Sequence, residues 1–220
     1  MGSYSLLQIV GSTIVGGLVL LMLFRFNTIM FEKKHSYNTQ NILQSNLTVA
    51  SNLISLDLNK IGYCENKIQA VEIFKDPIVE ATDSTFAFKT DVPVSEQNPF
   101  GDGVVDIVKY YLGHSIPSTP STRDKIFYRK INASAPSELN YGVTKLKFKY
   151  YDTAGTLLPS TPADLKQIAV IEYTITIEDI YGFSYTYAVP DSGSGTFQGE
   201  SYFTELSKTR KVGIINLKKR

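Results

Sequence analysis

An uncharged apolar run near the start of the chain constrains its fold most. Leu6–Phe24 contains no charged residue, and only one Gln, one Ser and one Thr interrupt it. A helix needs about 20 such residues to cross a ~30 Å hydrocarbon core. The second half of the run has no polar face, so it belongs in lipid or inside an assembly. We therefore expect a helix over residues 4–27 that spans a membrane or lies inside an assembly, with membrane lipid as the partner of Leu6–Phe24.

The next residues predict that the helix continues. Residues 28–61 contain neither Pro nor Gly. Apolar residues recur there every three or four positions, which is typical of one face of an amphipathic helix. These are Leu43, Leu47, Ala50, Leu53 or Ile54, Leu58 and Ile61. Gly62 is the expected stop because glycine commonly follows the last helical turn. We expect an amphipathic continuation over residues 28–62.

From residue 63 onward the pattern changes to short β-branched and aromatic runs separated by turn residues, which predicts strands. The strands are expected near Thr85–Thr90, Val104–Leu112, Lys125–Ile131, Val143–Tyr151, Gln167–Glu178, Ser184–Val189 and Lys211–Asn216. The segments between them are too short for crossover helices, so the sheet should be antiparallel. The predicted fold class is α+β, a long N-terminal helix packed on an antiparallel β-sheet head at residues 63–220.

The alternation within the strands predicts which side chains form the core. Leu146, Phe148 and Tyr150 alternate with three lysines, which should lie on the wet face. The residues expected in the core include Phe86, Val105, Ile107, Phe127, Phe148, Val170 and Ile175. The single cysteine, Cys64, should behave as a small buried hydrophobe, and residues 191–199 should form a flexible loop.

Several classes of function are disfavoured by the composition. The formal net charge is +1 and the charges are scattered, which argues against nucleic acid as a partner. One cysteine and two distant histidines leave no disulfide or zinc pattern. No catalytic motif stands out, so we expect no catalytic residues and no cofactor. Asp102 and Asp106 are weak calcium candidates, because the stretch lacks the full spacing of an EF-hand loop; a turn leading into a strand is preferred.

The start of the chain reads Gly2-Ser3-Tyr4-Ser5-Leu6-Leu7-Gln8-Ile9-Val10. This segment resembles the processing site and helix start of type IV pilins and type II secretion pseudopilins. In that family an aromatic residue opens the mature chain, and a glutamate normally sits at the fifth mature position. With Tyr4 as the first mature residue, Gln8 takes the place of that glutamate, and Ser3 stands where glycine is usual. Residues 1–3 would then be a leader for prepilin peptidase; a cut after Gly2 is the alternative register.

The resemblance extends into the later chain. The stretches 56–63, 103–112, 126–132 and 142–152 are similar in order and spacing to W-type minor pilins and J-type pseudopilins. The resemblance implies a non-enzymatic subunit that helps to initiate or cap a type IV pilus or type II secretion-like filament. Its partners would be other pilin or pseudopilin subunits and the assembly platform. It would cross the bacterial cytoplasmic membrane once, with the head outside the cytoplasm.

The charges that flank the apolar run favour the opposite orientation. Arg25, Lys33 and Lys34 follow the run, whereas no basic residue precedes it. The positive-inside rule alone would therefore place the head in the cytoplasm. That rule is weaker when the N-terminal flank is only a few residues long, so we follow the orientation that the family resemblance implies.

Two other functions stay open. The first is an unprocessed single-span scaffold of another envelope complex. The second is an extracytoplasmic module that binds a small ligand or polysaccharide through tyrosines around Tyr110, Tyr181 and Tyr185. A basic cluster near the C-terminus could also contact anionic lipid or an acidic partner, although a solvated chain end is the default. Its members are Lys208, Arg210, Lys211, Lys218, Lys219 and Arg220.

Overall fold

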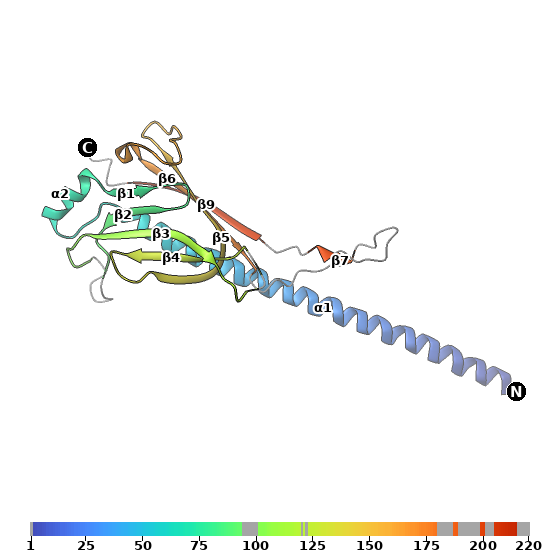
Figure 1. Ribbon diagram of the computed structural model, residues 1–220. Helices are drawn as coiled ribbons and strands as arrows, with labels where there is room; N and C mark the ends of the chain where they lie inside the picture. Colours follow the sequence, from blue (N-terminus) through green and yellow to red (C-terminus); the bar gives the residue numbers. More distant parts are fainter. Residues whose placement is uncertain are drawn as a thin grey trace. The chain divides into compact units, whose positions relative to one another are not determined.

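The computed structural model describes residues 2–93, 101–119, 121, 123–179, 187–188, 199–200 and 205–214. The chain divides into two compact units, Met1–Ile42 and Leu43–Arg220. One helix, α1 (Gly2–Asn59), runs through the first unit and into the second (Figure 1). It covers the apolar run and the predicted amphipathic segment as far as Asn59.

The last part of α1 packs one stripe of side chains into the second unit. Its buried members are Leu43, Leu47, Ala50, Ile54 and Leu58. Of the two alternatives at one position of the stripe, Ile54 is fully buried and Leu53 is only partly buried. The helix ends at Asn59, and Gly62 lies just beyond it at φ +76°, a conformation that glycine adopts without strain. The Gly62 N–H donates to the Lys89 carbonyl at 2.9 Å, which ties the end of the helix to the sheet.

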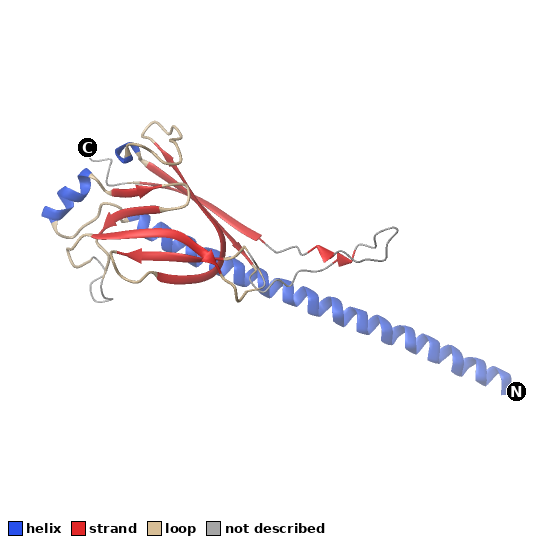
Figure 2. Cartoon of the chain, viewed as in Figure 1, coloured by secondary structure: helices blue, strands red, loops and turns tan. Residues whose placement is uncertain are grey.

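A seven-stranded antiparallel sheet makes up most of the second unit (Figure 2). Its spatial order is β1-β2-β3-β4-β5-β6-β9. The strands are β1 (Ile78–Ala81), β2 (Phe86–Thr90), β3 (Asp106–Ser115), β4 (Lys125–Ile131), β5 (Ser137–Tyr151), β6 (Val170–Glu178) and β9 (Glu205–Gly213). The remaining elements are α2 (Lys67–Lys75), the 3₁₀ turn η1 (Leu165–Gln167) and a short pair, β7 (Tyr187–Ala188) and β8 (Gly199–Glu200). The predicted α+β class with an antiparallel sheet is confirmed.

The core lies between the buried stripe of α1 and one face of this sheet. Phe86 is fully buried, and its ring centroid lies 5.6 Å from those of Phe88 and Phe148 and 5.9 Å from that of Tyr150. Burial of one such side chain contributes about 1.5–3 kcal/mol. In β5, Leu146, Phe148 and Tyr150 are buried and the three lysines that alternate with them are exposed, so the predicted alternation is confirmed.

The predicted core is wrong at the start of β3. Ile107 is 38% exposed, whereas Val108 and Tyr110 are fully buried. The sequence there carries apolar residues at adjacent positions, and a shift of one residue moves every side chain to the other face. Val105 and Val170, also predicted as core, are only partly buried. Four of the seven predicted core residues are fully or almost fully buried: Phe86, Phe127, Phe148 and Ile175.

The strand predictions succeed most closely at β4, whose bounds match. The last strand begins at Glu205 rather than at Lys211. Its first residues are mostly charged or polar, so the sequence pattern did not predict them as a strand. Neither β1 nor α2 was predicted; each is short, and α2 depends on Asn66 as its cap, whose side chain accepts from the Ile68 N–H at 3.0 Å. Of the predicted strand 184–189 only the two residues of β7 are described, and nearly all of the predicted loop 191–199 lies outside the described residues.

Candidate functional site

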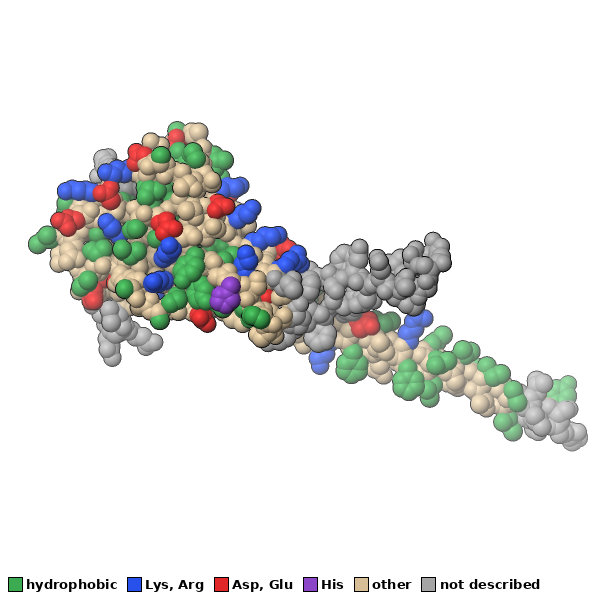
Figure 3. All heavy atoms as spheres, viewed as in Figure 1, with side chains coloured by type: hydrophobic (Ala, Val, Ile, Leu, Met, Phe, Trp, Pro, Cys, Tyr) green, Lys and Arg blue, Asp and Glu red, His purple; other side chains and the backbone are tan. Residues whose placement is uncertain are grey.

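The first unit exposes an apolar helix on every side. From Ile9 to Phe31 its large apolar side chains are between 41% and 72% exposed. Figure 3 shows these side chains along the helix. This is the one described helix that is long and apolar enough to cross a membrane. Since exposure of this much apolar surface to water is costly, the helix is compatible with membrane anchoring or with burial in an assembly.

The hydroxyl groups in the apolar run and just after it donate hydrogen bonds to carbonyls of the same helix. The hydroxyls of Ser12 and Thr13 donate to the Ile9 carbonyl at 2.9 and 2.8 Å, and Thr28 donates to the Phe24 carbonyl at 3.1 Å. In lipid, polar groups need such internal partners. Gln8 differs, because its carboxamide is long and exposed. It is the polar group in this run best placed to bond another helix.

Three glycines leave part of the surface of this helix without side chains. A Cβ added at Gly11, Gly16 or Gly17 would meet nothing within 4 Å. Glycine inside a helix costs about 1 kcal/mol relative to alanine, and no contact within this unit requires it. Small residues let a second helix approach closely in a membrane.

The predicted processing site lies at the very start of α1. The backbone of Gly2, Ser3 and Tyr4 is helical, and the Tyr4 side chain is 82% exposed. Tyr4 and Gln8 are one helical turn apart, so they lie on the same side of the helix. The assignment of these residues to leader cleavage stays a prediction.

A buried ion pair fastens the last turns of α1 to the sheet. Asp57 Oδ2 accepts from Arg129 Nε at 2.7 Å and from the Tyr110 hydroxyl at 2.5 Å. The Asp57 and Arg129 side chains are only 14% and 17% exposed. Burial, followed by the charge and hydrogen bond of Asp57, raises the pKa of Tyr110 well above its ordinary value. Burial opposes the charge on Arg129, but the hydrogen bond and charge of Asp57 outweigh it and raise the Arg129 pKa.

A second polar contact joins α1 to β6 and β9. The Tyr173 hydroxyl donates to the Ser51 carbonyl at 2.8 Å, and it lies 2.9 and 2.7 Å from the hydroxyls of Ser51 and Ser55. Arg210 Nη1 donates to Ser55 Oγ at 3.1 Å. Because these groups are buried or half-buried, each hydrogen bond holds the helix in one register against the sheet.

A buried carboxylate organises the loop that precedes β3. Asp91 is fully buried and accepts from the backbone N–H groups of Glu65, Asp102 and Gly103 at 2.9–3.1 Å. The Cys64 thiol donates to the same carboxylate at 3.7 Å. Burial and the nearby Asp91 charge raise the pKa of Cys64, so the thiol stays protonated. Cys64 is 7% exposed, which confirms the predicted buried hydrophobe.

We expect Gly101→Ala to destabilise the head more than Gly155→Ala does. Both glycines have positive φ, but a Cβ at Gly101 would lie 2.0 Å from Asp91 Oδ1, whereas one at Gly155 would meet open space. The difference should be at least about 1 kcal/mol, since the Asp91 hydrogen bonds must break or shift. Urea unfolding of both variants measures it. Equal losses would contradict a structural role for the Asp91 contacts.

The weak calcium candidates serve separate hydrogen bonds. Asp102 Oδ1 accepts from the Val104 N–H at 2.9 Å, which forms the expected turn before β3. Asp106 accepts from the Val92 N–H at 3.0 Å and from Asn132 Nδ2 at 2.5 Å. Within the described ranges, no three His, Cys, Asp or Glu residues gather in a group that could hold a metal ion.

The proposed tyrosine surface is wrong at the one position that the structure describes. Tyr110 is fully buried against Asp57 and stacks on Phe127 at 5.6 Å, so it is not available to a ligand. Tyr181 and Tyr185 lie outside the described residues. The sequence analysis did not predict the buried hydrogen-bonding roles of Asp57, Arg129 and Asp91. For Asp57 the one available signal was its position beside the buried apolar stripe of the helix.

Comparison with known proteins finds a likeness in structure and none in sequence. No protein-family model and no curated protein sequence matches the chain. Among solved structures the chain is similar to the type IV-like pilin TTHA1219 from Thermus thermophilus, at 11% sequence identity and a TM-score of 0.47. The alignment covers 80% of this chain and 98% of that one. A TM-score below 0.5 leaves the question of function to the residues of this chain.

Proposed function

We propose that this chain is a non-enzymatic minor pilin or pseudopilin. It would anchor in the membrane through Leu6–Phe24 and later pack this helix against sister helices as a filament forms. The observation that carries the proposal is the helix from Ile9 to Phe31, which exposes apolar side chains on every side and contains three glycines without a local role. Lipid and neighbouring helices both satisfy such a surface.

The N-terminal residues support the same proposal. Gly2, Ser3 and Tyr4 would form the processing site, with residues 1–3 removed by a prepilin peptidase. The mature chain would comprise residues 4–27 in the membrane or filament core, 28–62 as the amphipathic continuation, which is helical as far as Asn59, and the head at 63–220. The head would lie outside the bacterial cytoplasmic membrane.

Gln8 would give the subunit its place in the filament. A neutral carboxamide can donate to and accept from a neighbouring helix, but it cannot form an ion pair with a neighbour's amino terminus. Such a residue suits a subunit that initiates or caps the filament, where one neighbour is absent.

The N-terminal residue of the protein isolated from its native membrane tests the proposal. Intact mass and N-terminal peptide mapping should find a chain that begins at Tyr4, or at Ser3 if the cut follows Gly2. Methylation of that residue would add support for prepilin processing. A chain that begins at Met1 or Gly2 would contradict the proposal.

Such a result would favour an unprocessed single-span scaffold of another envelope complex. Two observations support that alternative: Ser3 stands where the family has glycine, and Arg25, Lys33 and Lys34 follow the apolar run. The two functions also differ in their partners, because only the filament subunit should cross-link to pilin-like chains through α1.

We expect Gln8→Leu to impair assembly while membrane anchoring is kept. Leucine preserves the apolar surface but removes the exposed carboxamide, so any hydrogen bond to a neighbouring helix is lost, worth about 1–2 kcal/mol or less in a membrane. Filament counts and membrane fractionation measure the two effects separately. Gln8→Asn, which keeps an amide, is the matched control. Normal filament numbers with leucine would count strongly against a role for this residue.

A further inference from the structure

One edge of the sheet is long, regular and open. The nine residues of β9 pair with β6 in unbroken register, from Glu205 opposite Glu178 to Gly213 opposite Val170. Within the described part of the chain, no strand pairs with the other side of β9. Proteins usually protect such an edge with a bulge, a proline or charged side chains. β9 has no bulge and no proline, but it carries Lys208, Arg210 and Lys211, which disfavour pairing with another basic strand and not with an acidic one. The outward-facing backbone N–H and C=O groups of β9 are therefore suited to another strand.

Two cations lie on the inner side of this edge. In the register, Lys208 stands opposite Ile175 and Arg210 opposite Tyr173. Directly opposed residues share a face of the sheet, and both Ile175 and Tyr173 are fully buried. Lys208 and Arg210 therefore lie on the face that packs against α1, where both are half-buried.

Neither of these cations has an acidic partner among the residues that the structure describes. No carboxylate there lies within 4 Å of Lys208 or Arg210, whereas Lys211, on the opposite face, pairs with Glu172 at 3.2 Å. Partly removing a charge from water is costly unless an opposite charge compensates. A carboxylate supplied from outside would provide that compensation.

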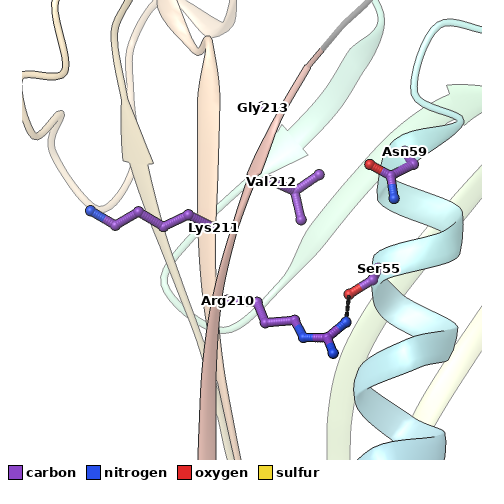
Figure 4. Close-up of a pocket in the computed structure, with 6 residues that line it drawn as sticks. All are labelled: Ser55, Asn59, Arg210, Lys211, Val212 and Gly213. Carbon is purple, nitrogen blue, oxygen red and sulfur yellow. Dashed lines mark hydrogen bonds between the residues drawn. The ribbon is translucent and has the colours of Figure 1, made fainter.

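A hollow beside Arg210 has room for such a group. Its volume is about 320 Å³, and its lining consists of Ser55, Asn59, Arg210, Lys211, Val212 and Gly213. Figure 4 shows Arg210 and Val212 pointing from β9 toward α1, with Lys211 pointing the other way. Arg210 uses Nη1 to bond Ser55. A guanidinium has five N–H donors, so others are left for a ligand.

We propose that the β9 edge binds an extended acidic segment of a partner protein. The segment would add as a strand and satisfy the open backbone groups of β9. One of its acidic side chains would enter the hollow and form an ion pair with Arg210, and a second, two residues away, would lie near Lys208. This docking site is additional to the helix surface on which the proposed function depends.

The charges favour an acidic partner over a second copy of this chain. Two β9 strands paired edge to edge would bring Lys208 and Arg210 of both copies together, and opposed like charges are destabilising. The other open edge, β1, has only four residues, and its Glu80 is already paired with Lys109 at 2.6 Å.

Fluorescence anisotropy with a labelled nine-residue peptide of alternating threonine and glutamate tests the proposal. The full chain in non-ionic detergent should bind this peptide about 10-fold or more tightly than the matched threonine–glutamine peptide. Arg210→Gln and Lys208→Gln should each weaken binding about 5-fold or more. The control Lys147→Gln removes an exposed charge from β5, away from this edge, and should leave binding within about 2-fold. The bound peptide should also slow hydrogen exchange at β9 amides.

Three results would overturn the proposal. One is equal affinity for the two peptides, or binding of neither. Another is loss of affinity in Lys147→Gln as large as in Arg210→Gln, which would mean non-specific attraction to positive charge. The third is concentration-dependent association of the chain alone that Thr209→Pro abolishes, which would assign the edge to a second copy. Circular dichroism verifies that each variant is folded. If Arg210→Gln does not fold, the affinity of Lys208→Gln for the peptide still tests the proposal.

Discussion

Asp57→Ala is expected to lower the free energy of unfolding of the head by about 3 kcal/mol. Removal of one partner from a buried ion pair typically costs about 3–5 kcal/mol, because the other charge is left buried without compensation. Here the substitution strands both the Arg129 guanidinium and the Tyr110 hydroxyl. We expect the lower end of this range because the Asp57 and Arg129 side chains are still 14% and 17% exposed to solvent.

Urea unfolding of the full chain in detergent, followed by tyrosine circular dichroism, measures this loss. Asp76→Ala is the matched control, because Asp76 pairs with Lys166 at 3.0 Å while both side chains are more than half exposed. Its loss should be about 0–1 kcal/mol. The double variant Asp57→Leu with Arg129→Met should recover much of the stability, since no charge is then left unpaired. Similar losses at Asp57 and Asp76 would show that the pair does not fasten the helix.

Val15→Arg combined with Val19→Arg is expected to abolish membrane insertion. The Leu, Ile, Val and Phe residues of the apolar run together favour insertion by about 4–7 kcal/mol, at about 0.3–0.6 kcal/mol each. Each arginine near the centre of the span costs about 2.5–3.5 kcal/mol. The two together therefore cancel the driving force.

Carbonate extraction of membranes measures this effect, and the double variant should move to the soluble or aggregated fraction. Asn41→Arg with Ser45→Arg is the matched control, because it places the same two charges at the same spacing on exposed positions of α1 beyond the run. That control should remain in the membrane. Retention of the Val15/Val19 variant would contradict anchoring through Leu6–Phe24.

The sequence predicts the helix well because its signals are local. The buried stripe of α1 repeats every three or four residues, and β5 alternates every two, so both faces could be assigned in advance. Where adjacent residues are both apolar, as at Ile107 and Val108, the period is ambiguous and tertiary contacts decide the register. At the start of this strand Asp106 accepts hydrogen bonds from Val92 and Asn132, two contacts that no local period predicts.

The polar contacts that organise the head could not be predicted in this way. Asp57 and Arg129 are 72 positions apart, and Ser55 and Arg210 are 155 apart. No local period links such pairs; only the folded sheet brings them together. The open edge at β9 was equally hidden, because its charged and polar residues resemble a loop more than a strand. The basic cluster near the C-terminus nonetheless contains both cations on the inner side of that edge, Lys208 and Arg210.

The environment of Cys64 has a practical consequence for studying any assembly that this chain enters. A thiol that is buried and kept protonated reacts slowly with maleimides, which attack the thiolate. A cysteine introduced at an exposed site away from the β9 edge, such as position 147, would then be the fast-reacting thiol in the chain. Spin labels and cross-linkers could be attached there without first removing the native cysteine, and distances between neighbouring molecules could be measured on an otherwise unaltered protein.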